Sequence, residues 1–258
     1  MAVDSIRGRA PRGIPERGPR QLTLDLPHVE SRGRADFLEG PANRAALALI
    51  DAFPDWPAPV VALVGPAGTG KSHLAGIFAD QTGADIAPAR DLLAEGGVPD
   101  MLAGGALALE DLDAAAPLRP ADEVALFHLL NLAKEQDARV LVTSRLPPAR
   151  LAEAVATADL ASRLRAMPAV TLDPPGEALL GAIALKLFAD RQIAPDEGLV
   201  TFLLARVERS VAALADLVAA LDREALARGR PVTRALAAEL LRAREGDDED
   251  EAPGTEPD

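Results

Sequence analysis

The sequence contains no cysteine and no tyrosine, and its aromatic residues are six phenylalanines and one tryptophan. Without cysteine the chain can form no disulfide, no thiolate metal site and no cysteine nucleophile. It also has no apolar run long enough to cross a bilayer, and its N-terminus has no signal-peptide hydrophobic region. These absences predict a soluble cytoplasmic protein without a membrane partner.

Basic residues are few relative to acidic ones, because 27 Lys and Arg against 40 Asp and Glu give a net charge of −13. The first 20 residues are nevertheless basic, with five arginines, whereas residues 245–258 hold eight acids and no base. The body between these ends is acidic, and DNA binding draws its affinity from basic side chains that neutralise phosphates. We therefore expect any contact with DNA to be indirect, through a partner.

The hydrophobic pattern divides the chain into segments. Residues 1–20 and 245–258 have the composition of disordered tails, one basic and one acidic. In residues 33–175 buried-strand patterns alternate with helical ones, which predicts an α/β domain with a mostly parallel sheet flanked by helices. Residues 176–244 have helical patterns only and predict a small all-helical lid domain. The expected strands are 60–64, 106–110, 139–144 and 169–172, and the expected helices are 43–53, 72–81, 121–136, 177–191, 195–207, 210–229 and 233–244.

A glycine-rich motif follows the first of these strands. The stretch VVALVGPAGTGKSHL contains G-x-x-x-x-G-K-S between a buried strand and a helix, the setting of a P-loop. In a P-loop, backbone N–H groups cradle phosphates, Lys71 reaches the β- and γ-phosphates and Ser72 ligates Mg²⁺. An ordinary glycine turn is the alternative, but it does not need the complete motif. The predicted nucleotide-binding residues of this segment are Gly65, Pro66, Ala67, Gly68, Thr69, Gly70, Lys71, Ser72 and His73.

Acidic residues end the strand at 106–110. A P-loop site needs an acid at the end of a neighbouring strand to hold Mg²⁺, and Glu110 stands where an aspartate is usual. We expect Glu110 and Asp111 to take the catalytic role there, with Ser72 and Glu110 as the Mg²⁺ ligands. Solvated acids at a strand end are the alternative. Thr143 and Ser144, at the end of the strand 139–144, are candidate sensors of the γ-phosphate.

The order of these motifs, followed by VLVTSRLPP, DLASRLRAMPAVTLDPPGE and the helical lid, resembles the AAA+ module of the bacterial replication initiator DnaA over about residues 33–244. Within that family it is most similar to short homologues of the Hda type, which regulate the initiator. The resemblance implies the fold of a P-loop AAA+ module and ADP or ATP with Mg²⁺ as ligands. It also puts Phe37 and Leu38 beside the adenine, although both could equally be core residues.

The segment SRL at 162–164 is the most specific part of the resemblance. Its arginine, Arg163, resembles the family's arginine finger, which is directed at nucleotide bound to a neighbouring subunit. The resemblance therefore implies DnaA as the partner whose ATP hydrolysis Arg163 assists in trans. Without the resemblance, Arg163 would be interpreted as a surface cation paired with an acid such as Asp159.

The sequence QLTLDL at 21–26 alternates leucine with other residues. The resemblance implies that it binds the β subunit of the DNA sliding clamp through Gln21, Leu22, Leu24 and Leu26, with the following residues to 32 as a linker. Such a peptide, when extended, presents alternate side chains to a pocket. The alternative is an edge strand of the domain's own sheet.

Four features depart from the initiator. No helix-turn-helix domain follows the lid, and the region between Ile86 and the strand at 106–110 is short for the family's element that contacts single-stranded DNA. Ala212 stands where the family's lid has an arginine that senses the γ-phosphate, and Arg145 stands where an aspartate follows TS. Together with Glu110, these differences predict weak or no intrinsic ATPase activity and ADP as a structural ligand.

Three functions remain open from the sequence. The resemblance favours a negative regulator of replication initiation that is bound to the DNA-loaded clamp and stimulates ATP hydrolysis by DnaA through Arg163. The second is a self-contained AAA+ ATPase, such as a helicase loader, that uses Glu110 and Asp111 for its own hydrolysis. The third is a non-catalytic, clamp-bound adaptor. A homodimer is compatible with all three.

Overall fold

The computed structural model describes residues 33–95, 102–196 and 198–250. The segment 21–26, with Gln21, Leu22, Leu24 and Leu26, lies outside these ranges, so its prediction stands as made. In the described part of the chain, no helix has the length and apolar character needed to traverse a bilayer.

A parallel sheet forms the centre of residues 60–171. Its strand order is β2-β3-β4-β1-β5, and every neighbouring pair runs parallel. The β-branched and leucine-rich runs predicted as strands form β1, β3, β4 and β5, because a strand covered on both faces needs apolar side chains on both. The bounds are β1 Val60–Val64, β2 Asp85–Pro88, β3 Ala106–Glu110, β4 Arg139–Ser144 and β5 Ala169–Thr171.

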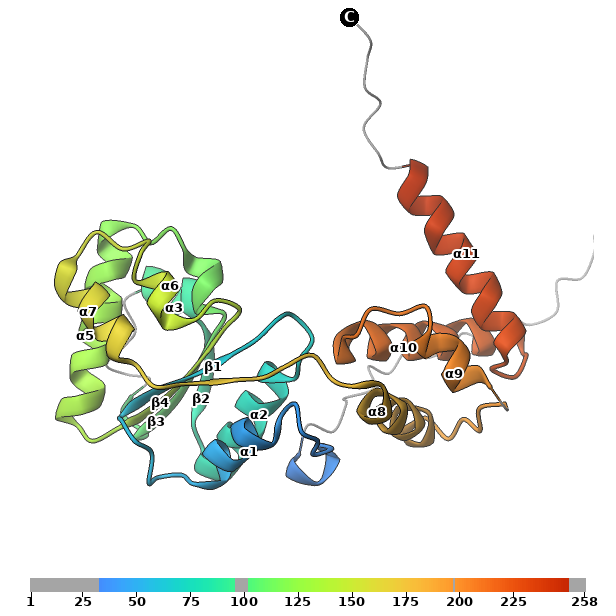
Figure 1. Cartoon of the computed structure of the whole chain (residues 1–258), viewed down its shortest axis with the longest axis horizontal. Coiled ribbons are helices and arrows are strands. Elements are labelled where there is room, and N and C mark those ends of the chain that lie inside the picture. The colour runs from blue at the N-terminus through green and yellow to red at the C-terminus, as the bar shows by residue number, and fades with distance from the viewer. Residues whose placement is uncertain (1–32, 96–101, 197, 251–258) are drawn as a thin grey trace, which may run out of the picture. The chain divides into compact units, whose positions relative to one another are not determined.

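Helices cover both faces of the sheet, and alternate side chains of β1, β3 and β4 enter two separate cores. Val61 and Leu63 of β1 pack with α1 and α2, whereas Val60 and Val64 pack with α3, α5, α6 and α7. Figure 1 shows these two groups of helices on opposite sides of the strands. The helices are α1 Arg44–Asp51, α2 Lys71–Thr82, α3 Ala89–Glu95, α5 Pro120–Glu135, α6 Pro148–Leu151 and α7 Ala158–Ala166.

Several of these elements have no counterpart in the sequence predictions. β2 has the sequence DIAP, and it is an edge strand with mostly exposed side chains, so it lacks the apolar run that marks the inner strands. α3, α6 and α7 are short helices, and two 3-10 helices, η1 at Arg34–Asp36 and η2 at Leu112–Ala115, were likewise not predicted. α7 carries Arg163.

Helices alone follow Pro175, as predicted. They are α8 Glu177–Asp190, α9 Leu199–Leu204, α10 Val211–Arg228 and α11 Arg234–Asp250. Their apolar faces form a third core that includes Phe188, Leu203 and Leu217. Gly229 ends α10 with a positive φ of 59°, the conformation expected of a glycine C-cap. α11 continues beyond the predicted end of the lid at 244.

Two predicted helix starts in the lid have different outcomes. Thr233 caps α11, since its Oγ1 accepts the N–H of Leu236 at 3.3 Å. The other helix was predicted over 195–207, but α9 begins only at Leu199. The Asp196 carboxylate instead accepts the N–H of Arg234 at 3.2 Å, at the start of α11.

Candidate functional site

The P-loop lies where the sequence predicts it, between β1 and α2. Gly68 and Gly70 have positive φ angles of 71° and 100°, which side chains with a Cβ rarely adopt. Gly65 has a second constraint, because a Cβ there would lie 2.4 Å from the carbonyl oxygen of Leu172. The fixed glycines of the motif are therefore required by the backbone path itself.

Lys71 is the buried cation of this loop. Its Nζ donates hydrogen bonds to the carbonyl oxygens of Gly65 at 2.7 Å and Pro66 at 2.8 Å. Burial lowers the pKa of Lys71, and this effect outweighs the opposing charges of Asp111, Asp113 and Glu110. The ammonium group is thus held at the mouth of the loop, where a phosphate would lie.

Glu110 ends β3, and its carboxylate has an unusual environment. Its Oε1 is buried and, within the described residues, has no hydrogen-bond partner. A buried anionic oxygen without a donor is suited to a cation, so Glu110 fits a role as ligand of a Mg²⁺ ion brought by a nucleotide. The described residues contain no group of three His, Cys, Asp or Glu that could hold a metal without such a nucleotide.

Asp111, the other predicted acid, is in the left-handed region with φ 54°. Its backbone N–H donates to Thr143 Oγ1 at 3.0 Å, which connects the end of β3 to the end of β4. The Ser144 hydroxyl exchanges hydrogen bonds with the backbone of Leu146. Thr143 and Ser144 are both completely buried, so in this structure their hydroxyls bind the backbone of the chain itself.

A second charged pair at this edge was missed by the sequence analysis. Asp113, in η2, accepts the backbone N–H of Arg145 at 2.8 Å and its Nε at 2.6 Å. Burial alone would raise the pKa of Asp113, but the hydrogen bonds and charge of Arg145 outweigh it and lower the pKa. The two residues are 32 positions apart, so the sequence offered no signal that would have paired Asp113 with Arg145.

An aromatic contact lies at the start of α2. The rings of Phe37 and His73 meet edge to face with centroids 5.2 Å apart. A Cβ on Gly70 would lie 3.5 Å from the Phe37 ring, so Phe37 reaches the P-loop. Leu38 is half-buried, and its carbonyl oxygen accepts the Asn43 side-chain amide at 3.0 Å. Phe37, predicted for the adenine side, is thus next to the loop.

The start of α10 in the lid also meets the P-loop. The Val211 N–H donates to the Gly68 carbonyl oxygen at 2.8 Å. A Cβ on Gly68 would lie 1.8 Å from Ser210 Oγ and 3.4 Å from the Ala212 methyl. The lid therefore contributes a hydroxyl and a methyl group at this point.

Arg163 is exposed on α7, a helix that contacts α5 and α6. Its guanidinium carbon lies over the Phe127 ring of α5, 4.7 Å from the centroid. In the described part of the chain, no ion pair joins Arg163 to Asp159, the acid that a purely structural interpretation would pair with it.

Glu123 of α5, which the sequence analysis also missed, anchors the beginning of the same helix. Its carboxylate accepts the backbone N–H groups of Ala156 at 2.7 Å and Thr157 at 2.9 Å, and the Thr157 hydroxyl. These hydrogen bonds, from the Thr157 hydroxyl first, lower the pKa of Glu123 despite its burial. α5 therefore contacts α7 both at its N-terminus and beneath Arg163.

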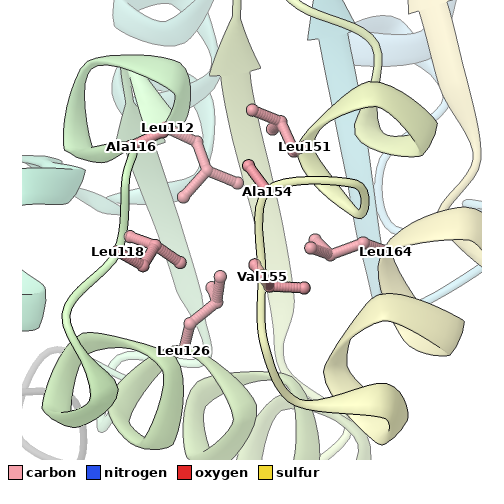
Figure 2. Close-up of a pocket in the computed structure, with 8 residues that line it drawn as sticks. All are labelled: Leu112, Ala116, Leu118, Leu126, Leu151, Ala154, Val155 and Leu164. Carbon is pink, nitrogen blue, oxygen red and sulfur yellow. The ribbon is translucent and has the colours of Figure 1, made fainter.

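A small cavity lies between η2, α5 and the segment α6–α7, as Figure 2 shows. Its volume is about 10 Å³, which is room for roughly one water molecule. All its lining side chains are apolar, so it offers no group that would bind a phosphate or a metal. The lining residues are Leu112, Ala116, Leu118, Leu126, Leu151, Ala154, Val155 and Leu164.

No protein-family model matches the chain, and no curated protein matches it in sequence. Several solved structures, in contrast, have a similar fold. Domain III of the replication initiation protein DnaA from Thermotoga maritima superposes with a TM-score of 0.69 at 20% identity, covering 84% of this chain and 98% of that domain. The fold is that of an AAA+ module.

Other solved AAA+ structures agree with that assignment. AMPPCP-bound DnaA from Aquifex aeolicus superposes with a TM-score of 0.62 at 16% identity, over 82% of this chain and 68% of that one. The FIGL-1 AAA domain in complex with ADP gives a TM-score of 0.60 at 18% identity, over 82% of this chain and 84% of that one. The predicted fold class, a P-loop AAA+ module followed by a helical lid, is confirmed.

Proposed function

We propose that this AAA+ module binds ADP or ATP with Mg²⁺ and acts as an Hda-type negative regulator, stimulating ATP hydrolysis by DnaA. The nucleotide part is supported by the complete P-loop, by buried Lys71 and by the AMPPCP and ADP complexes of similarly folded proteins. The regulatory part is supported by the similarity of fold to DnaA domain III and by the environment of Arg163.

The observation that carries the regulatory proposal is the unused hydrogen-bonding capacity of Arg163. Its guanidinium rests on an aromatic ring, and in the described residues its nitrogens make no hydrogen bond to their own chain. A planar guanidinium with available donors suits the phosphates of a nucleotide held by another molecule. Glu123 fixes the start of α7, so the helix that carries Arg163 is anchored to the sheet domain.

Each predicted nucleotide-site residue has a separate role in this proposal. The backbone N–H groups of residues 65–72 bind phosphate oxygens, and Lys71 donates to the β- and γ-phosphates. Ser72 and Glu110 would hold Mg²⁺, whose chemistry here is to neutralise phosphate charge. Phe37, Leu38 and His73 lie on the adenine side, and Asp111 holds the end of β3 against Thr143.

Arg163 acts on nucleotide bound to DnaA. Its donors bind the transferring phosphate and neutralise the charge that develops on it, an effect worth roughly 10³–10⁵ in rate for arginine fingers supplied in trans. Hydrolysis leaves DnaA in its ADP form, and initiation is not repeated. Because Glu110, Arg145 and Ala212 depart from the usual residues, we expect the chain's own ATPase to be weak.

The proposed link to DNA is the peptide at 21–26. Gln21, Leu22, Leu24 and Leu26 would bind the β subunit of the sliding clamp, and the following linker would allow the module to reach DnaA beside it. The acidic composition of the chain supports an indirect route, because direct binding to DNA needs basic side chains.

The deciding experiment measures DnaA ATPase with the full chain, the clamp and DNA present. Arg163→Ala should abolish stimulation, while Arg165→Ala, also an exposed arginine on α7, should retain it. Equal stimulation by wild type and Arg163→Ala would refute the finger. In that case a strong intrinsic ATPase lost in Lys71→Ala would favour a self-contained motor, and clamp binding without an effect on DnaA would favour an adaptor.

The tether has its own test. Deleting residues 21–26 should remove both the capture of the chain by immobilised clamp and the stimulation of DnaA, and should leave nucleotide affinity unchanged. Gln21→Ala should weaken capture in the same assay. Full stimulation by the deletion variant would exclude the tether and leave the arginine finger standing.

A further inference from the structure

The pair formed by Asp113 and Arg145 combines a buried acid with an exposed base. The Asp113 side chain is 3% exposed and that of Arg145 is 58% exposed. Both oxygens of the carboxylate are used, one by the backbone N–H and the other by Nε of Arg145. In the part of the chain that the structure describes, the terminal nitrogens Nη1 and Nη2 of Arg145 have no hydrogen-bond partner. Hydrogen bonds from its backbone N–H and Nε therefore fix Arg145, while Nη1 and Nη2 are available as donors.

The position of Arg145 in the fold puts this cation beside the P-loop. It directly follows β4, which pairs with β1, the strand that leads into the loop. The carbonyl oxygen of Ser144 accepts the N–H of Gly65 at 3.1 Å, so the residue before Arg145 is bonded to the first residue of the loop. Burial lowers the pKa of Lys71, and the positive charge of Arg145 lowers it further, which agrees with two cations facing one site.

The lid residues nearest to Gly68 of the P-loop do not add a second positive charge there. The lid atoms nearest to a Cβ on Gly68 belong to Ser210 and Ala212, which are small and uncharged. The acids Glu110, Asp111 and Asp113 lie close enough to Lys71 to act on its charge, and they would repel the terminal phosphate of a nucleotide. Arg145 neutralises Asp113 and adds its own charge at the same edge.

We propose that Arg145 binds the terminal phosphate of a nucleoside triphosphate held by the same chain, and that Asp113 positions it for this role. The inference rests on the proposed nucleotide site and concerns its specificity. In this role Arg145 would favour triphosphate over diphosphate, because it would contact only the terminal phosphate. The sequence analysis counted Arg145 as a departure that predicts weak ATPase activity, whereas in the structure it is a cation fixed by Asp113.

Asp113 is suited to this positioning role because separating its buried carboxylate from Arg145 would cost free energy. An almost completely buried carboxylate that loses its counter-charge keeps the cost of desolvation without compensation. Nε therefore stays on Asp113, which fixes the plane of the guanidinium and leaves Nη1 and Nη2 as its remaining donors. Phosphate is bound by Nη1 and Nη2 without breaking the ion pair.

The test measures dissociation constants of the full chain for ADP and for AMPPCP, both with Mg²⁺, by isothermal titration calorimetry. Arg145→Gln should weaken AMPPCP binding roughly 10- to 100-fold and ADP binding by less than about threefold, because one charge-assisted contact is lost from the triphosphate alone. Arg150→Gln is the control, since Arg150 is an exposed arginine nearby that pairs with Glu153. It should leave both constants unchanged.

Two further variants distinguish a role in triphosphate binding from a folding defect. Asp113→Asn should lower the ratio of AMPPCP affinity to ADP affinity, because Arg145 loses its orientation while keeping its charge. The double variant Arg145→Gln with Asp113→Asn leaves no unpaired buried charge and should bind AMPPCP as weakly as Arg145→Gln. A purely structural ion pair would change both affinities together.

The outcomes separate this inference from the function on which it rests. If wild type binds both nucleotides and Arg145→Gln affects both equally or neither, the role of Arg145 is wrong and the nucleotide site stands. If Lys71→Ala and wild type both fail to bind either nucleotide, the nucleotide site itself is wrong and the inference falls with it. A selective loss of AMPPCP affinity in Arg145→Gln supports both.

Discussion

Two arginines of this module are held in opposite ways. Arg145, at the edge of the sheet beside the P-loop, is joined to a buried carboxylate by two hydrogen bonds. Arg163, on α7, rests on the face of Phe127 without a hydrogen bond in the described part of the chain. A hydrogen-bonded ion pair with a buried acid fixes orientation, whereas an aromatic face supports a guanidinium and leaves all its donors available.

The contrast matches the two sites that these residues are proposed to serve. A cation that acts on nucleotide in its own chain meets a ligand in a constant position, so a fixed orientation is suitable. A cation that acts on nucleotide in another molecule must adjust to a surface that arrives separately. The weaker, non-directional contact with Phe127 permits that adjustment, since little is lost when the guanidinium moves.

The largest effect on stability should come from Arg145→Ala. This change leaves the buried Asp113 carboxylate with a backbone N–H as its remaining donor from residue 145, and we expect the midpoint of thermal unfolding at pH 7 to fall by roughly 5 °C or more. Arg163→Ala should stay within about 2 °C of wild type, because the exposed cation–π contact is weak. Equal shifts for the two variants would remove the contrast.

An intermediate effect is expected from Glu123→Gln, which weakens the anchor of α7. The hydrogen bonds lower the pKa of Glu123 in the folded state, so its contribution is present above the unfolded carboxyl pKa and is lost as pH falls through the folded one. The variant should lose about 1–2 kcal/mol of unfolding free energy at pH 7 and depend less steeply on pH under acid conditions. Denaturant titrations from pH 7 downward measure both quantities.

Glu135→Gln provides the control for that comparison, because Glu135 is an exposed acid near the other end of the same helix. It should leave both the free energy and its pH dependence as in wild type. If Glu123→Gln behaves like Glu135→Gln, the carboxylate of Glu123 does not hold α7.

The smallest effect concerns the ring beneath Arg163. A double-mutant cycle of Phe127→Leu and Arg163→Ala should give a coupling free energy of about 0.5 kcal/mol, the size of an exposed cation–π contact. Chemical denaturation of the four proteins supplies the cycle. A coupling of several kcal/mol would mean that Arg163 is held as firmly as Arg145, and the proposed adjustability would be lost.

Features that depend on neighbouring residues in the sequence were predictable. The P-loop needs glycines, a lysine and a serine in one short stretch, and β1, β3 and β4 are apolar runs whose predicted bounds agree with the structure. β2 was not predicted, because an edge strand containing Asp85 and Pro88 has no such run. The α/β fold class could still be predicted, because the alternation of strand and helix patterns is recognisable without β2.

The polar contacts that organise the site were not predictable in the same way. Asp113 and Arg145 are 32 residues apart, and Glu123 and Ala156 are 33 residues apart. Such pairs meet only after parallel strands bring the ends of β3 and β4 together and α5 packs beside α7. Charge alone does not select them, because the sequence offers many acids for each arginine. Thr143 illustrates the same limit, since its hydroxyl meets the backbone of Asp111 from a different strand.

The segment between Asp113 and Glu123 has a long-range polar contact at each end. Asp113 accepts a hydrogen bond from Arg145 beside the P-loop. Glu123 lies in the first turn of α5 and accepts hydrogen bonds from the backbone at the start of α7. Arg119 and Asp122 close the N-terminus of α5 by hydrogen bonds to each other. The acid that binds Arg145 and the acid that anchors α7, the helix that carries Arg163, thus belong to one short stretch of chain.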